Sequence, residues 1–249
     1  SKKLAAGADA IVLDVKTGSG AFMKTEEEAL ALAREMVRIG NGAGKHTIAI
    51  VSDMDQPLGN AVGNALEVQE AIATLKGEGP EDFTELCLTL GSCMLVAGKK
   101  AETTEEARGM LQNVIEDRSA LRKLAEFVGA QGGDLEQVWH PERLPAAGIR
   151  EQIPAPEEGW LQAIQCEEIG NCSMILGGGR ETKESELDLS VGLILHKKVG
   201  DFVRKGEPMA TIFANDPEKK EAAEKRFLAA CRIGAEPVKK PKLIKAVIR

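Results

Sequence analysis

The chain has 249 residues, 43% of them hydrophobic and 29% charged, which is typical of a globular protein with a sizeable core. Its formal net charge of −7 and its aromatic content of only 3% argue against nucleic-acid binding, because neither excess cations nor stacking side chains are available. No apolar run approaches the roughly 20 residues that span a bilayer, and the five cysteines follow neither a zinc spacing nor a dense disulfide pattern, so we expect reduced thiols in the cytoplasm.

The first 22 residues predict a helix end, a strand and a glycine-rich loop. Residues 1–7 are typical of the last turns of a helix, and residues 10–13 form a short apolar run typical of a strand buried on both faces. Asp14 and Lys16 stand at the carboxyl end of that strand, before Gly18-Ser19-Gly20. Open α/β sheets bind ligands at this end of their strands, so we expect the chemistry to begin here. The chain starts in mid-helix without an initiator Met, and we expect it to be the C-terminal part of a longer protein.

A βαβ unit and a series of helices are predicted next. Thr25 and the three glutamates after it open a helix, and residues 46–53 form a second strand. Further helices are expected over residues 64–75, 81–97, 103–116 and 119–128. The sequence therefore predicts an α/β domain over residues 9–150, with a mixed sheet flanked by helices, and residues 1–8 as the end of a helical domain.

After several prolines between residues 141 and 156 the pattern changes to short β segments. Strands are expected at residues 160–166, 191–196, within 199–212 and at 243–248, with a charged helix at 217–231. Residues 199–206 resemble the hammerhead hairpin of biotinyl and lipoyl carrier domains. Those domains need an exposed lysine at a hairpin tip, and none stands here in the right context because residues 215–217 lead into a helix, so we expect a structural role. Residues 151–249 are therefore predicted to form a smaller, β-rich, barrel-sandwich-like C-terminal subdomain.

The loop over residues 52–71 has the composition of a cation site. Its glycines and Pro57 can turn backbone carbonyls inward, and Glu70 on the following helix can supply a carboxylate oxygen. Such oxygens suit a hard monovalent or divalent cation. The alternative is a simple Asn/Gly turn before a helix, just as residues 14–22 can be a solvated loop. Both alternatives stay open at this point.

These segments together resemble the pyrimidine-nucleoside and thymidine phosphorylases. The similarity lies in residues 1–10, 13–22, 52–71, 75–80 and 195–201, extends over essentially the whole chain, and is greatest to bacterial enzymes of broad pyrimidine specificity. The resemblance implies a helical domain and a large α/β domain with a cleft between them. It implies that Lys2 contacts the pyrimidine base. It also implies that the carbonyls of Leu58 and Ala61 and the carboxylate of Glu70 hold a structural potassium ion.

The implied activity is reversible phosphorolysis of uridine, thymidine and deoxyuridine to the free base and (deoxy)ribose 1-phosphate. The resemblance implies a cytoplasmic homodimeric pentosyltransferase with phosphate as co-substrate, no organic cofactor and no nucleic-acid or membrane partner. No enzyme nucleophile is required, so no residue is assigned as catalytic. The family's phosphate-binding Lys-His-Ser motif and its dimer helices are not in this chain, which therefore supplies the C-terminal part of the site and is expected to be inactive alone.

A separate hypothesis comes from position in the sequence. Asp14 and Lys16, at a strand end, are candidates for support on the phosphate side of the site. Two other hypotheses for the function of the chain are alternatives to a phosphorylase. One is a non-catalytic fragment or binding domain. The other is an enzyme like anthranilate phosphoribosyltransferase, against which the lack of an acidic pair for magnesium near Asp14 argues.

Overall fold

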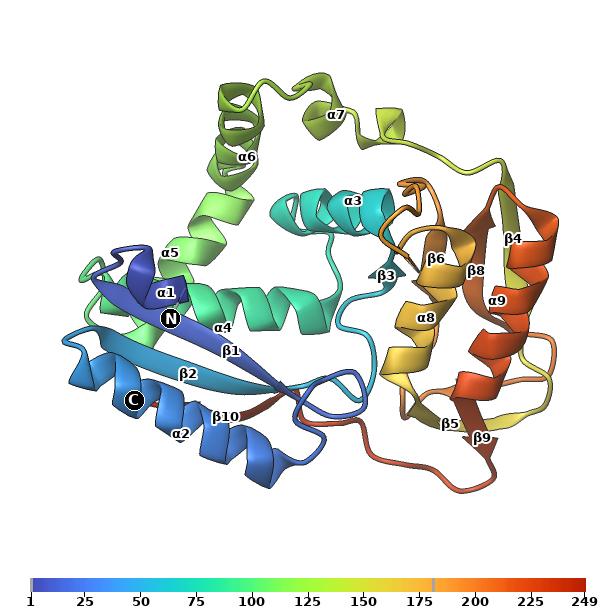
Figure 1. Cartoon of the computed structure of the whole chain (residues 1–249), viewed down its shortest axis with the longest axis horizontal. Coiled ribbons are helices and arrows are strands. Elements are labelled where there is room, and N and C mark those ends of the chain that lie inside the picture. Colours follow the sequence, from blue (N-terminus) through green and yellow to red (C-terminus); the bar gives the residue numbers. More distant parts are fainter. Residues whose placement is uncertain (1, 181) are drawn as a thin grey trace.

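The computed structural model describes residues 2–180 and 182–249 and has the predicted mixed α/β class. Helix α1 (Lys2–Ala5) leads into strand β1 (Ala10–Thr17), helix α2 (Glu26–Gly42) and strand β2 (His46–Asp53). β1 and β2 pair in parallel, with Thr17 opposite Asp53 at their carboxyl ends. Strand β10 (Ile244–Ile248) pairs antiparallel with the other edge of β2, which gives a three-stranded sheet of order β1-β2-β10 (Figure 1).

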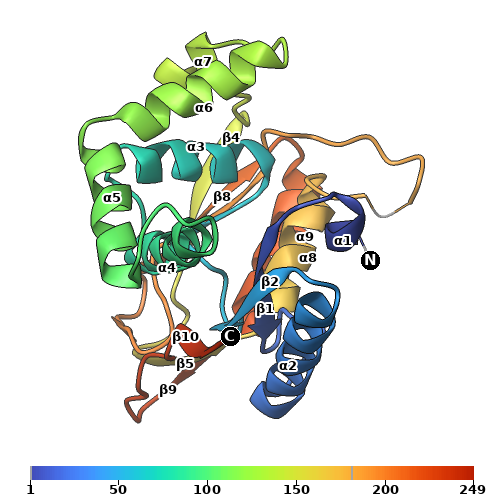
Figure 2. The same ribbon diagram turned by 90° about the vertical axis from the view of Figure 1, so that its left-hand side faces the viewer.

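The helices α2 and α4 (Glu81–Ala97) cover opposite faces of this sheet (Figure 2). Alternate residues of β2 face opposite sides, so Ala49 and Val51 pack with α2 while Ile48 and Ile50 pack with α4. α2 begins with the predicted cap, in which Thr25 and Glu28 exchange hydrogen bonds between side chain and backbone. The apolar central strand is thus buried on both faces.

The remaining helices of the first part lie on the side of the sheet that α4 covers (Figure 2). They are α3 (Asn64–Leu75), α5 (Thr104–Glu116), α6 (Ser119–Ala130), α7 (Glu136–Trp139) and a 3-10 turn over Pro141–Arg143. The predicted bounds of α3 and α4 are confirmed, and Thr103 caps α5 through the backbone N–H of Glu106. Ile72, Leu121 and Val138 join α3, α6 and α7 in a small core.

The C-terminal part consists of two antiparallel sheets and two helices around one core. Helices α8 (Cys166–Leu176) and α9 (Pro217–Ala230) lie side by side (Figure 1). One sheet has the order β3-β6-β8-β4 and the other β7-β5-β9. Their strands are β3 (Ala61–Val62), β4 (Ile149–Pro154), β5 (Gly159–Ile164), β6 (Gly192–Leu195), β7 (Phe202–Val203), β8 (Pro208–Ala214) and β9 (Cys231–Gly234). The two sheets match the predicted β-rich subdomain, although they form no closed barrel within the described residues.

Two of the differences from the elements expected from the sequence concern the site and the division of the chain. Residues 166–176 form helix α8, where only short β segments were expected. Its buried positions Ile169, Cys172 and Leu176 have helical spacing, and Gly177 ends it with a φ of +108°. Two strands also cross the predicted division at residue 150, because β3 pairs with β6 and β10 pairs with β2. The division of the chain into domains stays a prediction.

Across residues 2–180 and 182–249, no helix combines the length and the apolar character that a membrane span needs.

Candidate active site

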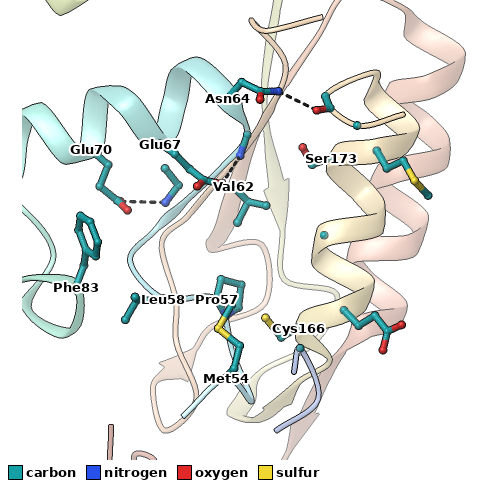
Figure 3. A pocket seen from close by; sticks show the side chains of 18 of the residues that line it. Met54, Pro57, Leu58, Val62, Asn64, Glu67, Glu70, Phe83, Cys166 and Ser173 are labelled. Atoms are coloured by element: carbon teal, nitrogen blue, oxygen red, sulfur yellow. Dashed lines mark hydrogen bonds between the residues drawn. The ribbon is translucent and has the colours of Figure 1, made fainter. Parts of the chain in front are cut away.

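A cavity of about 830 Å³ lies between α3, α8 and the carboxyl ends of β1 and β2 (Figure 3). Its floor includes the loop that follows β2, with Met54, Pro57 and Leu58. Of the residues singled out from the sequence, the cavity brings together Lys16, Leu58, Ala61 and Glu70. The ligand-binding edge expected for an open α/β sheet therefore coincides with a cavity.

Lys16 belongs to a small polar cluster at the carboxyl ends of β1 and β2. Its Nζ lies 2.6 Å from Asp14 Oδ2 and donates to Ser52 Oγ at 2.9 Å. The Ser52 hydroxyl in turn donates to Asp14 Oδ1 at 2.5 Å. Asp14 and Lys16 are two residues apart on one strand face, and Ser52 is opposite Lys16 in the parallel register. Ser52 was not predicted, although the strand ends of the βαβ unit place it there.

The glycine-rich loop after β1 is tied to the N-terminus of α8. The backbone N–H of Ser19 donates to Asp55 Oδ1 at 2.8 Å, and its hydroxyl accepts from the N–H of Cys166 at 3.1 Å. Because α8 has no side-chain cap of its own, Ser19 serves as its cap from a distant part of the chain. A Cβ on Gly18, whose φ is +121°, would lie 2.7 Å from Asp55, so glycine is required here.

Cys166, at the same contact, is not suited to act as a nucleophile. Cys166 is buried, and burial raises the pKa of its thiol to about 11. The thiolate is the reactive form of cysteine, and at neutral pH it would be scarcely populated here. Cys166 therefore serves as a packing residue of the cavity wall, against which Gly20 closes without a side chain.

Glu70 organises the loop that precedes α3. Its Oε1 accepts from the backbone N–H groups of Asn60 at 2.8 Å and Ala61 at 3.0 Å. Burial raises the pKa of the Glu70 carboxyl above its ordinary value, and the two hydrogen bonds oppose that rise.

The residues present fit a monovalent cation in the type of donor that they carry. Leu58, Ala61 and Glu70 line one cavity and offer backbone carbonyls and a single carboxylate. Among the described residues, no group of three or more His, Cys, Asp and Glu side chains is arranged to hold a metal. A cation bound here would therefore depend largely on backbone oxygens.

Lys2 lies outside this cavity. It is exposed on α1, and α1 lies near the amino end of β1 (Figure 1). The cavity is lined by residues at the carboxyl end of that strand. The eight residues of β1 separate the two ends by about 23 Å. The structure thus brings Lys16, Leu58, Ala61 and Glu70 together but leaves Lys2 apart, and the contact of Lys2 with a base stays a prediction.

The chain matches two protein-family models. Residues 1–121 match the glycosyl transferase family, a/b domain, and residues 160–234 match the pyrimidine nucleoside phosphorylase C-terminal domain. The first match contains β1, β2 and α3, and the second contains α8. The cavity therefore lies between segments that belong to the two matched domains.

Curated relatives extend this similarity along the chain. It is 57% identical over 248 residues to the pyrimidine-nucleoside phosphorylase of Bacillus subtilis (strain 168), covering 100% of this chain and 57% of that protein. It is 55% identical over 244 residues to the pyrimidine-nucleoside phosphorylase of Geobacillus stearothermophilus, covering 98% of this chain and 56% of that protein. The chain thus spans somewhat more than half the length of these relatives. By these matches, the chain belongs to the pyrimidine-nucleoside phosphorylase family.

Proposed function

We propose that the natural protein containing this chain catalyses reversible phosphorolysis of pyrimidine nucleosides. Uridine, thymidine and deoxyuridine would be converted to the free base and (deoxy)ribose 1-phosphate, with phosphate as co-substrate and no organic cofactor. The observation that carries the proposal is 57% identity to an enzyme of that name along the chain, including the segments around the cavity. We further propose that the protein acts in the cytoplasm as a homodimer.

In this reaction a phosphate oxygen forms a bond to C1′ of the nucleoside. The bond between C1′ and the base nitrogen breaks, and its electron pair leaves with the base. Negative charge therefore grows on the base in the transition state, and a positively charged donor at a base carbonyl stabilises that state more than the bound substrate. We assign this role to Lys2, which is exposed on α1.

Asp14 and Lys16 are proposed to support the phosphate side. The Lys16 ammonium has three N–H donors, of which Asp14 and Ser52 engage two. One donor remains for a ligand in the cavity. Because Asp14 already offsets the charge of Lys16, the pair would position a phosphate oxygen more than attract it from a distance.

A potassium ion is proposed at Leu58, Ala61 and Glu70. The two carbonyls and the Glu70 carboxylate would hold it at the junction of the loop and α3. Its proposed role is structural: it would fix the loop that forms the cavity floor and supply no chemistry to the bond-breaking step.

The decisive experiment measures release of uracil from uridine by the natural protein, with and without phosphate. Phosphate-dependent release with formation of ribose 1-phosphate is expected, and the 249-residue chain alone should be inactive. Release without phosphate would indicate a hydrolase. Magnesium-dependent use of a phosphorylated ribose donor would indicate a phosphoribosyltransferase, and no turnover by the natural protein would favour a non-catalytic domain.

A further inference from the structure

Lys198 is less exposed than most lysines, which usually lie at the protein surface. It follows β6 in the C-terminal part, and its side chain is only 17% exposed. Its Nζ donates to the backbone carbonyl of Pro57 at 2.5 Å, to the carbonyl of Gly59, and to Asp82 Oδ2 at 3.1 Å. All three donors of the ammonium are therefore used.

These partners resemble the ligands of a bound monovalent cation. Two backbone carbonyls and one carboxylate, all hard oxygen donors, converge on a single positive charge. The carbonyls belong to alternate residues of one loop, with Leu58 between them. An ordinary salt bridge would need the carboxylate alone.

Acidic side chains bind the backbone N–H groups of the same loop. Asp82 Oδ2 accepts from the N–H of Gly59 at 3.2 Å, while Glu70 accepts from Asn60 and Ala61. Gly59 has a φ of +67°, and a Cβ there would lie 2.1 Å from Glu70 Oε2. The carbonyls of Pro57 and Gly59 thus face Lys198, and the N–H groups of residues 59–61 face Asp82 and Glu70.

The charges around the loop favour one ammonium at this place. Glu70 and Asp82 carry two negative charges near the single positive charge of Lys198. Burial has the largest effect on the pKa of Glu70 and raises it, while the charge of Lys198 lowers that pKa and the charge of Asp82 raises it. Without Lys198, the carbonyls of Pro57 and Gly59 and the partly buried carboxylate of Asp82 would lose a partner, which is costly for polar groups that water reaches only in part. The cluster would then hold a vacancy suited to a small exchangeable cation.

We propose that Lys198 is a positioning residue whose ammonium serves as a tethered monovalent cation. It holds the loop of residues 57–61 in the conformation that forms the cavity floor, and so joins the C-terminal part to the site. This role goes beyond the proposed phosphorolysis and does not depend on it, because it concerns only residues of this chain.

The test is replacement of Lys198 by methionine in the natural protein. Thermal unfolding is measured at constant ionic strength in choline, lithium, potassium or ammonium chloride. In choline chloride the Lys198→Met protein should lose roughly 5–10 °C in Tm relative to the unsubstituted protein. Ammonium, and to a lesser extent potassium, should restore most of that loss, and lithium should restore little.

Lys197→Met is the matched control. This neighbouring lysine pairs with Glu207 at 2.6 Å outside the loop, and its removal should produce neither the large loss nor the ammonium-specific recovery. The readout is the difference between variant and unsubstituted protein in each salt, so a potassium ion at Glu70, which both proteins would bind, does not imitate it.

Lys198→Gln gives a second variant with a polar but uncharged end, for which the same order of cations is expected. If both variants lose stability equally in every salt, or remain unfolded in all of them, Lys198 acts through fixed contacts alone and the proposal is overturned. That outcome would leave the phosphorolysis assay unaffected.

Discussion

The C-terminal sheets and the sheet of β1, β2 and β10 bury their apolar side chains in different ways. Among residues 2–180 and 182–249, nineteen buried residues around α8 and α9 share a single cluster. In the first sheet, β2 divides the buried residues into one cluster of six facing α2 and one of four facing α4. The first sheet has the thinner core, yet it carries Asp14, Lys16 and Ser52.

This difference explains why the site loops are held by the C-terminal part. The loop after β1 contacts α8 through Ser19, whose hydroxyl caps that helix. The loop after β2 is held by Lys198. A large continuous core provides a rigid frame, whereas two small clusters leave less to restrain loops between them. Site geometry therefore depends on residues far from the first sheet.

The largest expected effect is on the free energy of unfolding, and it compares one substitution in each of the two cores. Phe227 on α9 is among the largest fully buried side chains, so Phe227→Ala should lower the free energy of unfolding by about 3–5 kcal/mol. Val37→Ala, in the cluster facing α2, removes fewer atoms from a smaller core and should cost roughly 2 kcal/mol or less. Urea denaturation measures both. Equal losses would show that the two cores are equally important to overall stability.

Activity should depend on the thinner part without a matching loss of stability. In the natural protein, Lys2→Ala should lower kcat/KM by ~10²-fold or more, because a charge-assisted hydrogen bond to the departing base is lost. Its Tm should change little, since Lys2 is exposed on α1. Lys3→Ala, the exposed neighbour, is the control and should keep normal kinetics. Unchanged kinetics for Lys2→Ala would remove Lys2 from the site.

The connection between the two parts can be tested at Gly18. Gly18→Ala places a methyl group against Asp55 in a backbone conformation that alanine rarely adopts, and should cost about 1–3 kcal/mol of stability. Because the loop would shift from α8, kcat/KM should also fall, by ~10-fold or more. Gly42→Ala, at the end of α2, meets no neighbouring atom and should be nearly neutral. Equal effects of the two substitutions would contradict the proposed connection.

The smallest expected effect concerns Glu70, which lies on α3 between the two parts. Burial raises its pKa above 4.5, so its contribution to stability is greatest when the carboxyl is protonated and is lost as pH rises through the folded-state pKa. A bound potassium ion favours the carboxylate and opposes this loss. Potassium should therefore raise Tm by roughly 1–3 °C at about pH 7 and by nothing at about pH 4.

Glu70→Gln is the control for this pH dependence. Its amide oxygen can still accept from Asn60 and Ala61, but it carries no charge for a cation. The difference between potassium and choline chloride should disappear at both pH values. A potassium response that persists in Glu70→Gln would place the ion elsewhere.

Local signals in the sequence predicted most elements, and distant pairings account for the rest. The first residues of α3 and α4 could be predicted because Gly63 and Pro80 lie directly before these helices. The apolar run at residues 243–248 predicted a strand but not its partner, since pairing with β2 is a property of the folded sheet. α8 was missed because Gln165 offers no side-chain cap, and its capping group comes from Ser19.

The same distinction applies to the candidate site. Leu58, Ala61 and Glu70 are close in sequence, and a loop with its following helix brings them to one cavity. Ser52 and Lys198 join the site only through strand register and through contact between distant segments. A lysine in a Lys-Lys pair gives no sign in the sequence that its ammonium contacts backbone carbonyls of a distant loop.

The pairing of β10 with β2 has a consequence for the order of folding. Ala49 and Ile248 are partners although they are about 200 residues apart, and closing so long a loop is slow. The strands from β4 to β9 find most of their partners within a much shorter span. We expect the C-terminal part to fold first and β10 to pair with the free edge of β2 afterwards. In pulsed hydrogen exchange during refolding, amides of β5 and β8 should gain protection before those of β10, and the reverse order would exclude this route.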